Sequence, residues 1–118
     1  MLSLIIQIIT METEKDNILS LEAGIVNILK NVYDPEIPVN IYDLGLIYDI
    51  ETDDNKKVLI TMTLTAPNCP VADILPNEIK EKVSTLPGVS EVEINLVFDP
   101  PWNQSMMSEE ALFELGML

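Results

Sequence analysis

Residues 64–75, LTAPNCPVADIL, form the stretch that decides the fold. A β-rich run at 58–65 precedes it, and a run with helical apolar spacing at 71–86 follows. Pro70 suits the first position of a helix, where its missing N–H costs no hydrogen bond, so the only cysteine, Cys69, falls at the N-cap. The exposed N–H groups of a helix start favour a thiolate over a thiol. The stretch therefore predicts a strand-to-helix corner that carries a candidate reactive thiol or soft-metal ligand.

A second interpretation of Cys69 stays open on the residues alone. Lone cysteines in intracellular proteins are commonly small, inert core residues. Against this, Pro67 and Pro70 set the backbone on both sides of Cys69, and corners between elements tend to be exposed.

Composition narrows the function. The chain of 118 residues predicts one domain with one core, and a single cysteine excludes an internal disulfide framework and favours a reducing, cytoplasmic compartment. The absence of histidine excludes Ser-His and Cys-His catalysis. With 20 acidic and 6 basic side chains the net charge is −14, which predicts no nucleic-acid partner and no anionic membrane partner. One thiol cannot hold a cluster alone, so a metal would be shared between subunits, completed by other ligands or bound transiently.

The predicted elements follow one another without an internal repeat. The apolar opening, residues 1–10, is too short to span a bilayer. We expect residues 1–17 to be an N-terminal tail, its first ten residues an extension before a natural start at Met11, and residues 18–118 to form the single domain. Apolar spacing and turn residues predict helices at 17–32, 71–86 and 109–115 and strands at 44–50, 57–65 and 90–98.

These elements predict an α/β (α+β) fold of order α-β-β-α-β-α, with a three-stranded sheet covered on one face by two helices. Pro76 predicts a kink or a late start of the second helix. The side chains of the last strand that are expected to face the core are Val92, Ile94, Leu96 and Phe98. Whether it runs parallel to the second strand stays open, and two unpaired edges leave a homodimer as an alternative.

Three carboxylates, Asp34, Glu36 and Asp43, lie in the loop before the first strand. Asp34 and Asp43 also fit turn or cap positions, and Glu36 fits a solvated surface. If the predicted hairpin brings Asp43 close to Thr65 and Cys69, its carboxylate can accept the thiol proton or share a metal. The same negative charge would raise the pKa of the thiol, and the sequence does not rank the two effects.

Trp102 follows the last strand in the sequence DPPW. If the last two strands are parallel, this tryptophan lies at the Cys69 end of the sheet. It then roofs the site or anchors a partner protein, or it simply packs on the edge of the core.

Taken together, the segments DPEIPVNIYDLGLIYDI, MTLTAPNCPVADILP, LPGVSEVEINLVFDPPW and MMSEEALFELGML resemble the SufT-like metal–sulfur cluster assembly factors. That family includes the small cytosolic iron–sulfur targeting proteins, the PaaD accessory proteins and N-terminal domains of some Mrp-type ATPases. The resemblance covers residues 18–118. The chain lacks the cysteine-bearing C-terminal extension of PaaD proteins, which disfavours that branch.

The resemblance implies a fold like the C-terminal domain of NifU-type scaffolds, and a role in maturing or delivering iron–sulfur clusters. Carried over residue by residue, it implies Cys69 as the reactive thiol and transient metal ligand, and a cofactor-binding set made of Glu36, Asp43, Thr65, Cys69 and Trp102. It also implies a transient iron or iron–sulfur cluster, with no stably bound cofactor. The implied partners are the assembly machinery and client apoproteins.

Three functional hypotheses follow. The first is a non-enzymatic assembly factor in which Cys69 is a transient ligand or persulfide carrier. The second is an enzyme with Cys69 as nucleophile and Asp43 or Glu36 as base, acting on a thioester or persulfide; no catalytic residue is established, and Cys69 is the candidate reactive thiol. The third is a pure protein-interaction adaptor.

Overall fold

The structure, a computed structural model, describes residues 20–35, 37–65 and 74–117. The described chain begins in a helix that extends to residue 29. The remaining elements are α2 (Ile41–Leu44), β1 (Ile47–Thr52), β2 (Lys57–Met62), α3 (Ile74–Ser84), β3 (Glu91–Leu96), a 3-10 helix η1 (Gln104–Met106) and α4 (Glu109–Glu114).

The three strands form one sheet in the order β1-β2-β3. β1 pairs antiparallel with β2, and the register shifts between Ile47 and Asp49, which leaves Tyr48 as the extra residue of a bulge. β2 pairs parallel with β3, from Lys57 opposite Glu91 to Met62 opposite Leu96. The carboxyl ends of β2 and β3 therefore meet at the same end of the sheet.

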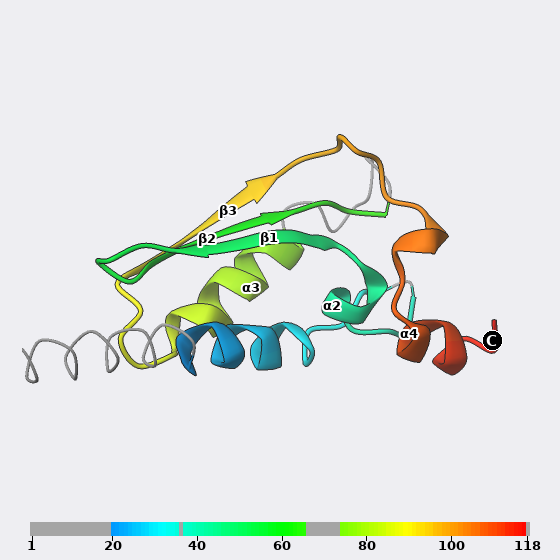
Figure 1. The fold of residues 1–118 in the computed structure, drawn as a ribbon, viewed down its shortest axis with the longest axis horizontal. Helices are drawn as coiled ribbons and strands as arrows, with labels where there is room; N and C mark the ends of the chain where they lie inside the picture. Colours follow the sequence, from blue (N-terminus) through cyan, green and yellow to red (C-terminus); the bar gives the residue numbers. More distant parts are fainter. Residues whose placement is uncertain (1–19, 36, 66–73, 118) are drawn as a thin grey trace, which may run out of the picture.

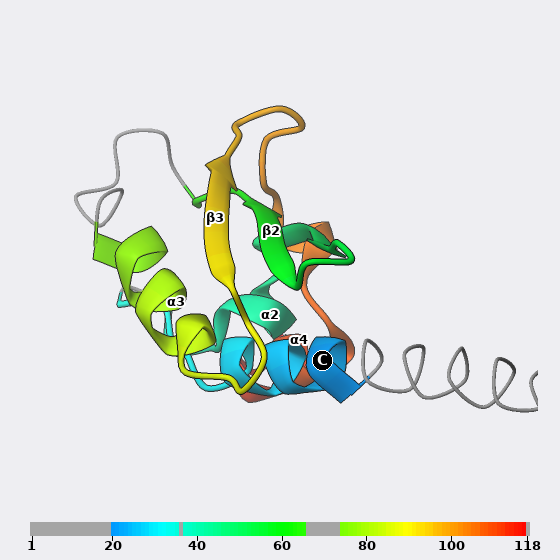
Figure 2. The same ribbon diagram turned by 90° about the vertical axis from the view of Figure 1, so that its left-hand side faces the viewer.

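The helices lie in a layer beneath one face of the sheet, as Figures 1 and 2 show. Alternation along β2 buries Val58, Ile60 and Met62 toward this layer. The helix at 20–29 and α3 bury matching stripes at helical spacing. The stripes consist of Leu21, Ile25 and Leu29 from the first helix and Leu75, Ile79 and Val83 from α3. The core lies between these two layers.

This architecture confirms the predicted fold class, a small sheet covered on one face by helices, and the predicted elements occur in the predicted order; α2 and η1 are two short helices that the prediction lacked. The closing helix is also confirmed, because the Ser108 side chain accepts the backbone N–H of Ala111 as its cap. Pro76 lies in the first turn of α3 as described from Ile74, where backbone N–H groups have no partner within the helix. The tail at 1–17 lies outside the described residues.

Two details of the sequence prediction are wrong. Leu44 is not the first residue of a strand but the last residue of α2, and β1 begins at Ile47. Phe98 does not face the core; its side chain is 40% exposed, because β3 ends at Leu96 and the chain then leaves the sheet.

Candidate functional site

The segment that carries Cys69 follows the carboxyl end of β2 in the chain. The backbone N–H of Val97 donates to the carbonyl oxygen of Met62 at 2.8 Å, so the exits of β2 and β3 lie side by side. Thr65, a half-buried residue in a bend, is the last described residue before the segment, and Ile74 is the first after it. Cys69 itself and Glu36 lie outside the described residues.

Asp43 is held by α2, a helix that Asn40 caps. The side-chain oxygen of Asn40 accepts the backbone N–H of Asp43 at 2.9 Å, and its amide nitrogen donates to Oδ2 of Asp43 at 2.8 Å. Both residues are only 9% exposed. Gly45, with φ of +87°, ends the helix, as a left-handed C-cap residue does. Asn40 therefore fixes both the start of α2 and the direction of the Asp43 carboxylate.

Residues 97–108, here called the arm, connect β3 to α4 and return to α2 and β1. The Trp102 indole N–H donates to the Leu44 carbonyl at 2.7 Å, and the Tyr48 hydroxyl donates to the Pro100 carbonyl at 2.7 Å. The backbone N–H of Ser108 donates to the carbonyl of Asp43 at 2.8 Å. Three hydrogen bonds thus fasten the arm to α2 and the start of β1, around Asp43.

The structure brings some of the predicted site residues together. Asp43 lies in α2, and Trp102 is attached to the same helix by its hydrogen bond to the carbonyl of Leu44, the residue after Asp43. Trp102 also packs against the core, which favours the interpretation that it closes the core edge. The hydrogen bonds found for Asp43 go to Asn40 and Ser108, and none joins it to Thr65 in the described part of the chain.

Asp34 has a turn role, as one interpretation of the sequence expected. Its Oδ1 accepts the backbone N–H of Ile37 at 3.0 Å, and the residue is 5% exposed. Within residues 20–35, 37–65 and 74–117, no three acidic or cysteine side chains cluster as a metal site would require.

The opposite face of the sheet is solvated and acidic. Lys57 Nζ lies 3.3 Å from Glu93 Oε2 and 3.8 Å from Glu91 Oε2. The hydrogen bond with Glu93 raises the pKa of Lys57, and the charge of Glu91 adds to the effect. Asp49 and Glu51 on β1 are exposed on the same face, opposite Thr61 and Leu59.

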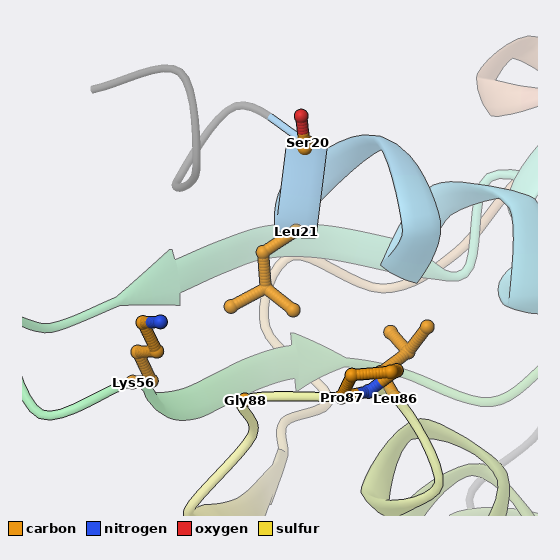
Figure 3. Close-up of a pocket in the computed structure, with 6 residues that line it drawn as sticks. All are labelled: Ser20, Leu21, Lys56, Leu86, Pro87 and Gly88. Carbon is orange, nitrogen blue, oxygen red and sulfur yellow. The ribbon is translucent and has the colours of Figure 1, made fainter. Parts of the chain in front are cut away.

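Two open hollows lie at opposite ends of the sheet. One of about 460 Å³ lies at the turn end of the sheet, lined by Leu21, Lys56, Leu86 and their neighbours (Figure 3). The other, of about 500 Å³, is lined by Tyr42, Gly45, Ile47, Tyr48, Pro100 and Met106. Ile47 pairs with Met62 at the exit of β2, so this second hollow is on the side of the site.

Sequence reasoning missed Asn40 and Tyr48. The spacing of Asn40 three residues before Asp43, followed by Gly45, is the signature of a capped helix and could have revealed α2. No comparable signal marks Tyr48, because its partner is a backbone carbonyl 52 residues away.

A family model described as iron-sulfur cluster assembly protein matches residues 22–95 of the chain, a range that includes Asp43, Thr65 and Cys69. The chain belongs to this family. The membership confirms the resemblance noted from the sequence motifs and the general assignment to iron–sulfur cluster assembly.

Two relatives are similar over nearly their whole length. An Fe-S protein maturation auxiliary factor of Porphyromonas gingivalis is 55% identical over 100 residues, which are 85% of this chain and 95% of the relative. The auxiliary factor YitW of Bacillus subtilis is 41% identical over 83% of this chain and 96% of its own.

Solved structures agree with the fold. A domain of unknown function from Bacillus anthracis superposes with a TM-score of 0.78 at 40% identity, over 84% of this chain and 94% of that one. A conserved hypothetical protein from Thermotoga maritima gives 0.68 at 41% identity, over 78% and 90%. None of the helices in the described ranges has the length and apolar character that crossing a bilayer requires.

Proposed function

We propose that this protein is an accessory factor that helps to mature iron–sulfur apoproteins, with the Cys69 thiolate as a transient ligand for iron or a cluster, or as a persulfide carrier. The observation that carries the proposal is family membership across residues 22–95, together with relatives named as maturation auxiliary factors. The iron–sulfur cluster is cargo in this scheme, and the protein acts without turnover of a small substrate.

The described residues support specific roles in this scheme. Asp43 presents a carboxylate held at one oxygen by Asn40 and close to the end of the sheet from which the Cys69 segment leaves. Such a carboxylate can orient a cation or accept a thiol proton. The Trp102 indole N–H donates a hydrogen bond to the Leu44 carbonyl, so we propose that Trp102 holds the arm against α2. Thr65 and Glu36 complete the proposed set on family grounds.

The wider proposals follow from the same picture. We propose that residues 18–118 form the one assembly domain and that the protein acts in the cytoplasm, where a lone thiol stays reduced. Its partners would be the assembly machinery and client apoproteins. Among the described residues no further strand pairs with the outer edges of β1 and β3, which leaves room for a homodimer that places two Cys69 thiols in one assembly.

The test is complementation in Bacillus subtilis cells that lack YitW. Expression of this chain should restore the activity of iron–sulfur enzymes in cell extracts, and Cys69→Ser at the same protein level should not. Lys82→Gln serves as a control, because this surface side chain is half exposed and pairs with Glu78 on its own helix. Full activity with Cys69→Ser would reject a thiol-centred function and favour an adaptor.

A further inference from the structure

The hollow beside α2, here called the arm groove, is an open surface in which polar and apolar atoms are about equally exposed, with a tyrosine on each of two sides. Tyr42 of α2 stands on one side, Ile47 and Tyr48 of β1 form another, and Pro100 and Met106 of the arm close the third. The volume of about 500 Å³ accommodates one large side chain and the backbone around it. The Tyr42 side chain remains 37% exposed. Methionine at such a surface adapts its shape to different side chains.

The arm groove exists before any partner arrives, because hydrogen bonds join the arm to β1 and to α2. The Tyr48 hydroxyl donates a hydrogen bond to the Pro100 carbonyl oxygen at 2.7 Å, and the same hydroxyl oxygen lies 3.7 Å from the Met106 sulfur. At the base, a Cβ on Gly45 would collide with the carbonyl of Met106, so the arm and α2 are in direct contact there. A preformed groove avoids most of the entropy cost of ordering a binding site.

The charges beside the arm groove select the partner. Two exposed carboxylates are sequence neighbours of residues that line the groove: Asp49 follows Tyr48, and Asp99 precedes Pro100. A third, Glu51, lies two residues after Asp49 on the same face of β1. Lys57 on that face is already paired with Glu91 and Glu93. Lys30, 5.4 Å from the Tyr42 ring centre, supplies one positive charge against these three carboxylates. The surroundings are therefore net negative, like the chain as a whole.

We propose that the arm groove docks a basic segment of a protein partner, with one aromatic or long aliphatic side chain inserted between Tyr42 and Tyr48 and with lysine or arginine beside it facing Asp49 and Asp99. The inserted side chain provides the affinity, and the charges provide orientation and a fast encounter. That the partner is a client or an assembly protein rests on the proposed function. The binding of a basic segment in the groove is argued from the lining residues and charges alone.

The first experiment uses a labelled peptide as the probe, with one central phenylalanine flanked on both sides by lysines. Fluorescence anisotropy should show the wild-type chain binding it at least tenfold more tightly than a peptide with alanine in place of phenylalanine. The variants Tyr42→Ser and Asp49→Lys should each weaken binding about fivefold or more. Glu81→Lys, the same charge change on the exposed surface of α3, should change it less than twofold.

Three results would overturn the proposal: equal binding of the alanine peptide, equal weakening by Glu81→Lys, or no binding to the wild-type chain. Self-association that Tyr42→Ser abolishes would identify a second copy of this chain as the occupant instead. Circular dichroism of each variant verifies that it folds.

A second readout separates this proposal from the proposed function. Cys69→Ser should bind the peptide as the wild type does, because the arm groove contains no thiol. In the Bacillus subtilis cells, Tyr42→Ser and Asp49→Lys should lower iron–sulfur enzyme activity at normal protein levels, whereas Glu81→Lys should not. Peptide binding without this loss in cells would overturn the role of the arm groove in docking an assembly partner and leave the thiol function standing.

Discussion

Replacement of Asn40 by alanine should cost far more stability than the loss of one helix cap. Asn40 supplies the cap of α2, worth about 1 kcal/mol. Its amide also donates to a nearly buried carboxylate, Asp43 Oδ2, at 2.8 Å, and hydrogen bonds to charged groups contribute about 1.5–3 kcal/mol. Asn40→Ala should therefore lower the free energy of unfolding by about 3 kcal/mol. In a domain of this size each kcal/mol shifts Tm by about 4 °C, so we expect a fall of about 12 °C.

Two matched variants separate the contributions. Asn103 caps η1 in the same way, with its side-chain oxygen 2.9 Å from the Ser105 backbone N–H, but it is exposed and holds no carboxylate. Asn103→Ala should cost about 1 kcal/mol or less. Asn40→Ser keeps a capping oxygen and loses the amide donor, so it should cost about 2 kcal/mol.

Urea unfolding followed by circular dichroism measures all three variants. Equal losses for Asn40→Ala and Asn103→Ala would refute the claim that Asn40 holds a buried carboxylate in place. A full recovery by Asn40→Ser would show that only the cap contributes.

Three further predictions, two on contacts around the site and one on the opposite face of the sheet, are tested by urea unfolding. In Gly45→Ala the alanine must adopt φ of +87° and its Cβ collides with the arm, so the variant should lose about 2–5 kcal/mol of unfolding free energy. Gly116→Ala, at φ of +73° with open space around it, should lose about 1 kcal/mol. Similar losses in the two variants would contradict the close contact between Gly45 and the arm. Trp102→Phe keeps an aromatic ring but leaves the Leu44 carbonyl unpaired, with an expected loss of about 1–2 kcal/mol, and an unchanged stability would exclude that hydrogen bond. The raised pKa of Lys57 means that its stabilising effect is present below the ordinary lysine pKa of about 10.4 and is lost as pH rises through the higher folded value. The stability difference from Lys57→Gln should therefore be present at neutral pH, shrink in high salt, and vanish at strongly alkaline pH; a difference independent of pH would contradict the ion pairs.

The sequence predicts the two layers of the fold because its apolar periods are long enough to be read. β2 alternates over six residues and α3 repeats its stripe over three turns, and both patterns match the buried residues. The parallel pairing of β2 with β3 required the structure, since a helix crossover permits either neighbour. Once the parallel pairing is known, it follows that the carboxyl ends of β2 and β3 lie at the same end of the sheet.

The helix α2 escaped prediction because four residues are too few to show a helical period. Leu44, Leu46, Tyr48 and Ile50 alternate with other residues in the sequence, and this alternation suggested a strand that extends too far toward the N-terminus. The stronger local signal was the cap at Asn40 together with the glycine at position 45.

The arm could not be placed from the sequence for a different reason. Its anchors, Trp102 and Tyr48, donate to backbone carbonyls, and a carbonyl acceptor carries no residue identity that a pattern could reveal. Of the proposed site residues, Asp43 and Trp102 are brought to one helix by these contacts. The roles of Cys69 and Glu36 still rest on sequence and family.

Anaerobic reconstitution with ferrous iron and sulfide tests the central claim most directly. Bound iron per chain and visible absorbance are measured for the wild type, Cys69→Ser and Asp43→Asn after desalting. The wild type should retain chelator-labile iron with visible absorbance, Asp43→Asn should retain less, and Cys69→Ser should retain none above a chain-free blank. Equal iron and absorbance in wild type and Cys69→Ser would contradict a function that depends on this single sulfur.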